Sequence, residues 1–92
     1  MIQNFAHKAL QRFFEDGSTK AIQPAHRRRI ADILDLLDAA HKVQDMDFPG
    51  SGLHPLKGKL KGYWAVKVSE NWRVIFQFTE GHAYRVNYID YH

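Results

Sequence analysis

The sequence predicts an α+β fold in which two N-terminal helices pack on a small twisted antiparallel sheet. Hydrophobic residues recur at helical spacing in the first half of the chain, and they alternate with polar residues after residue 62. Short polar segments separate the alternating stretches, which is typical of an antiparallel meander. The chain has 92 residues, of which 45% are hydrophobic, so we expect one domain over residues 1–92.

The first expected helix begins after a short strand at residues 1–4. Asn4 is the predicted N-cap, because its side chain can accept hydrogen bonds from backbone N–H groups that the first turn leaves unpaired. Gly17 is predicted to end the helix, since glycine readily adopts the left-handed conformation found at helix ends. The apolar stripe between them consists of Ala6, Ala9, Leu10, Phe13 and Phe14.

The second expected helix begins at Pro24, whose missing N–H would be unpaired at that position in any case, and reaches Lys42. The run Arg27–Arg29 near its start has two readings. It is either a solvated helix face in which Asp32 and Asp35 offset the charge, or a basic patch for RNA or an acidic partner. The apolar stripe consists of Ile30, Ile33, Leu34, Leu37 and Ala40 or His41.

A loop over residues 43–52 precedes the strands, and short turns are expected at Ser69–Asn71 and Glu80–His82. Alternation assigns one set of side chains to the face that the helices cover: Trp64, Val66, Val68, Trp72, Val74, Phe76, Phe78, Tyr84, Val86 and Tyr88. The opposite face is then polar and carries no acid: Lys67, Arg73, Gln77, Arg85, Asn87 and Tyr91, with Lys57 entering from the preceding strand.

Positive charge is concentrated in this half of the chain. The net charge is +3, but residues 51–69 hold four lysines and no acid. Such a cationic surface can bind phosphate, so we expect RNA contacts from Lys59, Lys61, Lys67 and Arg85. A solubilising surface without a ligand is the alternative.

The residue types on this face suit RNA cleavage without a metal. A base must take the proton of the ribose 2′-OH, cations must stabilise the phosphorane, and an acid must protonate the departing oxygen. Histidine, lysine, arginine and tyrosine can fill these roles. No two of the six histidines lie within five residues of each other, and no zinc motif is present, so we expect neither a metal nor another cofactor.

Four motifs, in order, resemble the HigB family of the RelE/ParE superfamily of bacterial toxins: "LHPLKG", "GYW", "NWRVIFQF" and "NYIDYH". The resemblance covers the whole chain. It implies a RelE-like fold and endoribonuclease action on mRNA in the ribosomal A site. It also implies a HigA-type helix-turn-helix antitoxin as partner, with operator DNA bound only through the antitoxin complex.

The family's site residues match this chain at His54, Lys57, Arg73, Asp90, Tyr91 and His92. We assign His92, or Asp90 acting with it, as the general base, and His54 as acid or phosphate contact. Lys57 and Arg73 would neutralise the phosphate, and Tyr91 would stack on a base or orient the nucleotide. Strict alternation places Asp90 and His92 on the face opposite Tyr91, so a common site requires the strand to end or twist near Ile89.

One position departs from the family pattern. Relatives often have an arginine near the end of the "GYW" strand, where this chain has Lys67. Lysine keeps the charge and loses the planar two-pronged contact to phosphate.

Two other functions remain open from the sequence. The ParE branch shares the fold and is implied to inhibit gyrase without cleaving RNA, and a non-catalytic nucleic-acid-binding co-repressor would also suit exposed arginines and aromatics. Titrating groups such as His54 and His92 favour cleavage. The chain has no cysteine, no signal peptide and no long apolar run, so we expect a cytoplasmic bacterial protein without a membrane partner.

Overall fold

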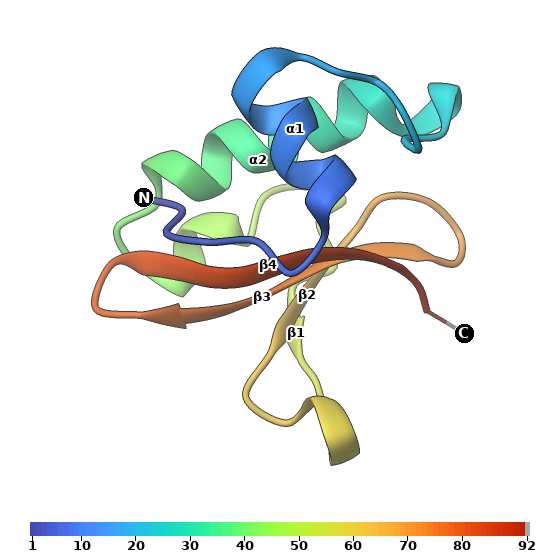
Figure 1. The fold of residues 1–92 in the computed structure, drawn as a ribbon. Helices are drawn as coiled ribbons and strands as arrows, with labels where there is room; N and C mark the ends of the chain where they lie inside the picture. Colours follow the sequence, from blue (N-terminus) through green and yellow to red (C-terminus); the bar gives the residue numbers. More distant parts are fainter. Residues whose placement is uncertain (92) are drawn as a thin grey trace.

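Two helices cover one face of a four-stranded antiparallel sheet in the computed structural model, which describes residues 1–91 (Figure 1). The strands lie in the chain order β1-β2-β3-β4. The elements are α1 (Lys8–Asp16), η1 (Pro24–His26), α2 (Arg27–Ala39), η2 (Val43–Met46), β1 (His54–Pro55), η3 (Gly58–Leu60), β2 (Trp64–Lys67), β3 (Trp72–Thr79) and β4 (His82–Asp90). The predicted α+β class and the twist of the sheet are confirmed.

Helix α1 starts later than predicted. His7, not Asn4, is the N-cap, and its Nδ1 accepts a hydrogen bond from the Leu10 N–H at 3.1 Å. Asn4 instead accepts from the Arg85 N–H at 2.6 Å, because residues 2–5 run beside β4 and make two parallel bridges there. Gly17 ends the helix as predicted, with φ +77° and its N–H on the Phe13 carbonyl.

Helix α2 also differs from its expected boundaries at both ends. Pro24 opens the helical segment, but the first turn is the 3₁₀ turn η1, and α2 follows at Arg27. The helix ends at Ala39, three residues short of Lys42. The Asp45 carboxylate accepts from the N–H groups of His41 and Lys42, so these two residues belong to a capped turn and not to the helix.

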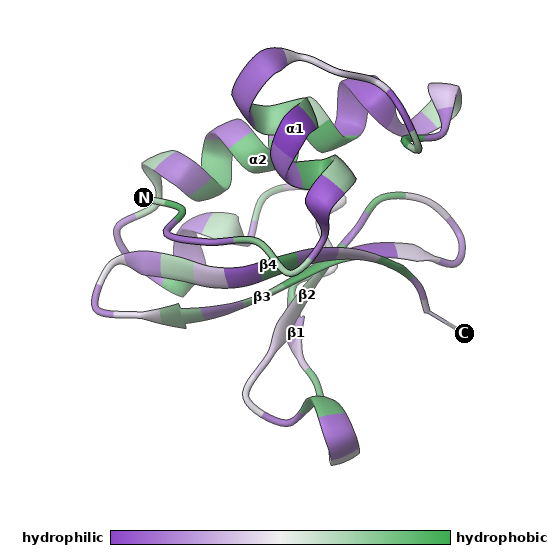
Figure 2. Ribbon diagram, in the orientation of Figure 1, coloured by the Kyte–Doolittle hydropathy of each residue, from purple (hydrophilic) through white to green (hydrophobic). Residues whose placement is uncertain are grey.

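The main hydrophobic core lies between the helices and the sheet. Hydrophobic and hydrophilic residues alternate along α2 in Figure 2, and its buried positions match the predicted stripe. Phe76, at the centre of β3, is fully buried. The other buried members of this core are Leu10, Ile22, Ile30, Ile33, Leu34, Leu37, Ala40, Met46, Val66, Val74, Ala83, Val86 and Tyr88.

The predicted position of Tyr84 on the helix-covered face is wrong. A β-bulge shifts the register between β3 and β4, so that Gln77 pairs with Tyr84 and Ile75 pairs with Asn87. Arg85, with φ +53°, is the residue that absorbs the extra position. Before the bulge Ala83 enters the core, and Tyr84 shares the outer face with Gln77.

The outer face of the sheet is not entirely polar. A second, smaller cluster forms there from Leu56, Ala65 and Ile75, with Leu60, Tyr63 and Ile89 packed against it. The residues after β1, including η3, form the tip of the β1–β2 hairpin, and Leu60 and Tyr63 from this segment pack on the cluster. Figure 1 shows η3 far from α1 and α2. The hairpin therefore places its lysines on the side of the sheet that the helices leave open.

Candidate active site

Three predicted site residues from three separate segments meet at one end of the sheet: His54 of β1, Arg73 of β3 and Tyr91 just after β4. The His54 and Tyr91 rings are 6.5 Å apart between centroids, and Arg73 Cζ is 6.0 Å from the centre of the Tyr91 ring. β1 and β4 are the opposite edges of the sheet, so these side chains meet across its outer face and not between neighbouring strands. We refer to these residues as the His54 cluster.

The hydrogen bond of His54 determines which ring nitrogen faces a ligand. Nδ1 lies 2.9 Å from the Gly52 carbonyl oxygen, which can only accept, so Nδ1 carries the proton. In the neutral ring Nε2 is then the acceptor. Partial exposure leaves His54 accessible, and Nε2 can take a proton or, once protonated, donate one.

Arg73 is held by the turn between β2 and β3. Its Nη1 donates to the carbonyls of Ser69 at 2.8 Å, Trp72 at 3.0 Å and Glu70 at 3.2 Å. One terminal nitrogen makes all three bonds, and a guanidinium has further N–H donors with which to bind a phosphate. The turn thus orients the cation under the Tyr91 ring.

Tyr91 is fixed through its backbone. Its N–H donates to the Asn71 carbonyl at 2.6 Å, whereas its side chain is 40% exposed. An exposed ring beside a cation and a histidine is able to stack on a nucleobase. The same turn that holds Arg73 therefore also positions Tyr91.

The predicted site is only partly assembled among the described residues. Asp90 pairs with Trp72 in the β3–β4 register, and Trp72 packs on the helix side. The Asp90 position therefore lies on the face of the sheet opposite that of Arg73 and Ile89, as strict alternation predicts. His92 lies outside the described residues, and its assignment as base stays a prediction.

The four predicted lysines are all exposed, and Lys67 is the one whose pairing places it beside the His54 cluster. Lys67 is exposed and is the direct cross-strand neighbour of Arg73, so it can share a phosphate with it. Lys57 is exposed just after Leu56, three residues beyond His54. Lys59 and Lys61 are exposed farther along the same hairpin, in and just after η3.

Arg85 lies on the same face with a partner that the sequence did not reveal. Its Nε donates to the Tyr63 hydroxyl at 2.8 Å, which joins β4 to the β1–β2 hairpin. The positive φ of Arg85 at the bulge redirects the strand here. Arg85 is exposed, and its other N–H groups extend the cationic surface beyond Lys67 and Arg73.

The three arginines of the run Arg27–Arg29 lie in three different environments. Arg28 is exposed and faces Asp32 at 3.8 Å, as in the solvated reading. Arg27 donates to the Ile22 carbonyl, and Arg29 donates to the carbonyls of Gly50 and Lys67. Arg29 thus ties α2 to the segment that leads into His54, a structural role that neither reading of the run anticipated.

No metal centre suits residues 1–91, where no group of three or more His, Cys, Asp or Glu side chains could hold an ion. The described helices also include none with the length and apolar character needed to cross a bilayer.

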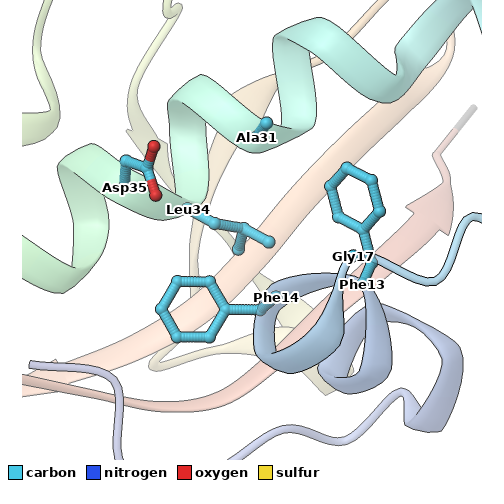
Figure 3. A pocket seen from close by; sticks show the side chains of 6 residues that line it. All are labelled: Phe13, Phe14, Gly17, Ala31, Leu34 and Asp35. Atoms are coloured by element: carbon cyan, nitrogen blue, oxygen red, sulfur yellow. The ribbon is translucent and has the colours of Figure 1, made fainter.

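A pocket between the two helices lies away from this chemistry. It has a volume of about 220 Å³, sits between α1 and α2, and contains one acid and no base or cation (Figure 3). Its lining consists of Phe13, Phe14, Gly17, Ala31, Leu34 and Asp35. RNA chemistry needs cations and proton-exchanging groups, so the exposed His54 cluster is the better candidate site.

Comparison with known proteins identifies the family. Residues 3–92 match the family model described as the RelE-like toxin of type II toxin-antitoxin system HigB. The chain belongs to this family. It is 44% identical to Endoribonuclease HigB of Proteus vulgaris over the full length of both chains. It is 33% identical to Toxin HigB-1 of Vibrio cholerae serotype O1, over all of this chain and 98% of that protein. As a member of a type II toxin–antitoxin family, this HigB-like toxin has an antitoxin as partner.

Proposed function

We propose that this HigB-family toxin is an endoribonuclease that cleaves mRNA without a metal ion. The observation that carries the proposal is the meeting of His54, Arg73 and Tyr91 at one exposed end of the sheet. The full-length similarity to Endoribonuclease HigB of Proteus vulgaris supports it. Inhibition of translation and of growth would follow from loss of intact message.

The proposed reaction uses the ribose 2′-OH as nucleophile. His92, or Asp90 acting with it, removes the 2′-OH proton, and the oxygen attacks the adjacent phosphorus. Arg73, with Lys57 and Lys67, stabilises the charge of the phosphorane. His54 donates a proton to the departing 5′-oxygen or contacts the phosphate through Nε2. The P–O5′ bond breaks and leaves a 2′,3′-cyclic phosphate.

The surroundings of the cluster support binding of a single strand. Tyr91 is exposed for stacking on a base, and the lysines of the β1–β2 hairpin and Arg85 carry positive charge along the same face. We propose that the substrate is mRNA in the ribosomal A site. A HigA-type helix-turn-helix antitoxin would neutralise the toxin and carry it to operator DNA, in the bacterial cytoplasm.

Cleavage mapping tests this function. We expect primer extension after brief expression of the full chain to show new 5′ ends within translated codons, and purified protein to cut message more efficiently with ribosomes than without. A chain ending at Tyr91 should fold normally. It should cleave mRNA much more slowly if His92 is the base. Intact mRNA with arrested replication would indicate gyrase inhibition instead, and unimpaired growth with intact mRNA would indicate a non-catalytic co-repressor.

A further inference from the structure

His26 is a buried histidine outside the His54 cluster. Its side chain bridges the helix layer to the sheet: Nδ1 lies 2.5 Å from the Tyr88 hydroxyl, and Nε2 lies 3.0 Å from the Ser69 hydroxyl. The residue is only 6% exposed, and its ring also packs against those of Trp72 and Tyr88. Both ring nitrogens are therefore engaged in one buried polar network.

Ser69, at one end of this network, contacts a residue of the His54 cluster. The Ser69 carbonyl accepts the shortest of the three bonds from Arg73 Nη1, at 2.8 Å. Two residues on, the Asn71 carbonyl accepts from the Tyr91 N–H. The turn at residues 69–71 therefore holds two members of the His54 cluster, and His26 holds the side chain of its first residue.

The Tyr88 end anchors the network in the sheet. Tyr88 is buried, pairs with Val74 across β3 and β4, and stacks on Trp72 at 4.5 Å between ring centroids. It lies three residues before Tyr91 on the same segment. His26 thus links a buried part of β4 to the turn that accepts the hydrogen bonds of Arg73.

The chemistry of the position requires an imidazole. A neutral ring donates from one nitrogen and accepts at the other, and each hydroxyl can take either role, so a histidine satisfies both partners at once. An apolar side chain of similar size would fill the space but leave the Ser69 hydroxyl without this partner. A residue needed only for packing would not have to meet both hydroxyls.

We propose that His26 is a positioning residue for RNA cleavage: through Ser69 it fixes the 69–71 turn, which orients the Arg73 guanidinium beside Tyr91. This inference rests on the proposed role of Arg73 in cleavage. His26 itself touches neither the substrate nor the reacting atoms.

A double-mutant cycle on the full chain tests the proposal. Single-turnover cleavage of ribosome-bound mRNA is measured for Ser69→Ala, Ser69→Thr, His26→Leu and Arg73→Ala, and for each of the first three combined with Arg73→Ala. We expect Ser69→Ala and His26→Leu to slow the chemical step by roughly three- to tenfold, the range set by one lost hydrogen bond. Ser69→Thr, which keeps the hydroxyl, should restore the rate. In the Arg73→Ala background the same changes should have almost no further effect.

A matched histidine controls for loss of stability. His7 caps α1 through a bond from the Leu10 N–H, and its ring centroid lies 5.9 Å from that of Tyr88. His7→Ala removes this cap and should lower the melting temperature without changing the cleavage rate. If His26→Leu does not fold, the Ser69 series decides alone. An unchanged rate for Ser69→Ala, or an equal loss with and without Arg73, would overturn the positioning role. Full activity of Arg73→Ala would instead refute the proposed site.

Discussion

At the scale of single residues, the site is oriented by bonds from side chains to backbone carbonyls. His54 donates to Gly52, Arg73 donates to Ser69, and Arg29 donates to Gly50. Hydrogen bonds from a charged guanidinium are stronger than neutral ones, so they fix a side chain well even at a partly exposed site. Lys57 differs, because it is exposed and would contribute chiefly through its charge.

Replacement of Lys57 by alanine tests how much the charge of this side chain contributes to cleavage. If Lys57 contacts the phosphorane, we expect Lys57→Ala to lower the cleavage rate by about 10²-fold, the effect of losing one transition-state contact. The melting temperature should not change, because an exposed side chain contributes little to stability. Lys20→Ala removes an equally exposed lysine from the segment between the helices and should cleave normally. Equal rates for the two variants would exclude Lys57 from the site.

At the scale of elements, one carboxylate holds the turn that follows α2. The N–H groups of His41 and Lys42 both donate to Asp45, and these bonds lower the pKa of the Asp45 carboxyl from its ordinary value of 3.8. The ionised form is therefore favoured in the folded protein. The resulting stabilisation is complete above the unfolded pKa and is lost as the pH falls through the lower folded pKa.

Asp45→Asn should show this dependence. We expect the parent protein to have a higher urea midpoint than the variant at neutral pH, and the difference to shrink as the pH falls below about 4. Urea titrations at several pH values provide the measurement. Asp47→Asn changes a nearby exposed acid and serves as the control. A difference that is constant across the pH range would show that the charge of Asp45 is not responsible.

Two other shifted groups lie near the sheet–helix interface rather than in the site. Burial lowers the pKa of His7, although a backbone hydrogen bond opposes that shift. Burial raises the pKa of Tyr88, and a hydrogen bond with the Gln23 backbone acts in the other direction. Both shifts favour the neutral side chains, which suits their positions between α1, η1 and β4.

At the scale of the whole molecule, the fold is two layers around one main core. That core holds buried side chains from α1, α2 and all of β2, β3 and β4, whereas the outer cluster around Ile75 is much smaller. Since the main core joins every large element, it should carry most of the stability.

Phe76→Ala should therefore be severely destabilising. Phe76 is fully buried at the centre of β3, and we expect a loss of about 3–5 kcal/mol in the free energy of unfolding, from lost transfer energy and the cavity that remains. Ile75→Val, on the neighbouring residue but in the outer cluster, should cost only about 0.5–1.5 kcal/mol. Chemical denaturation of both variants provides the comparison. A loss of less than about 2 kcal/mol for Phe76→Ala would contradict its place at the centre of the main core.

The accuracy of the sequence-based expectations depended on how local each feature is. The stripe of α2 and the alternation of β3 were predicted because each follows from spacing within one element. Tyr84 was assigned to the wrong face because a bulge adds one residue without breaking the hydrophobic pattern. Asn4 lost its predicted capping role because β4 offered its side chain another partner.

The residues of the candidate site also differ in whether the sequence could predict them. His54, Arg73 and Tyr91 were selected from residue type and from a family resemblance, and the fold brings these three together. His26 was missed, although a histidine at the entry to a helix, two residues after Pro24, is a visible feature of the sequence. Its partners are 43 and 62 residues away, so no local pattern could have indicated them.

The sequence by itself determined the element types, the covered face of most strands and the residues with the chemistry for RNA cleavage. These properties depend on side-chain type and on short-range periodicity. Tertiary structure alone decided the bulge at Arg85, the turn that holds Arg73 and the bridge from His26 to Ser69. Such features depend on contacts between distant segments, whose geometry is set only when the helices pack on the sheet.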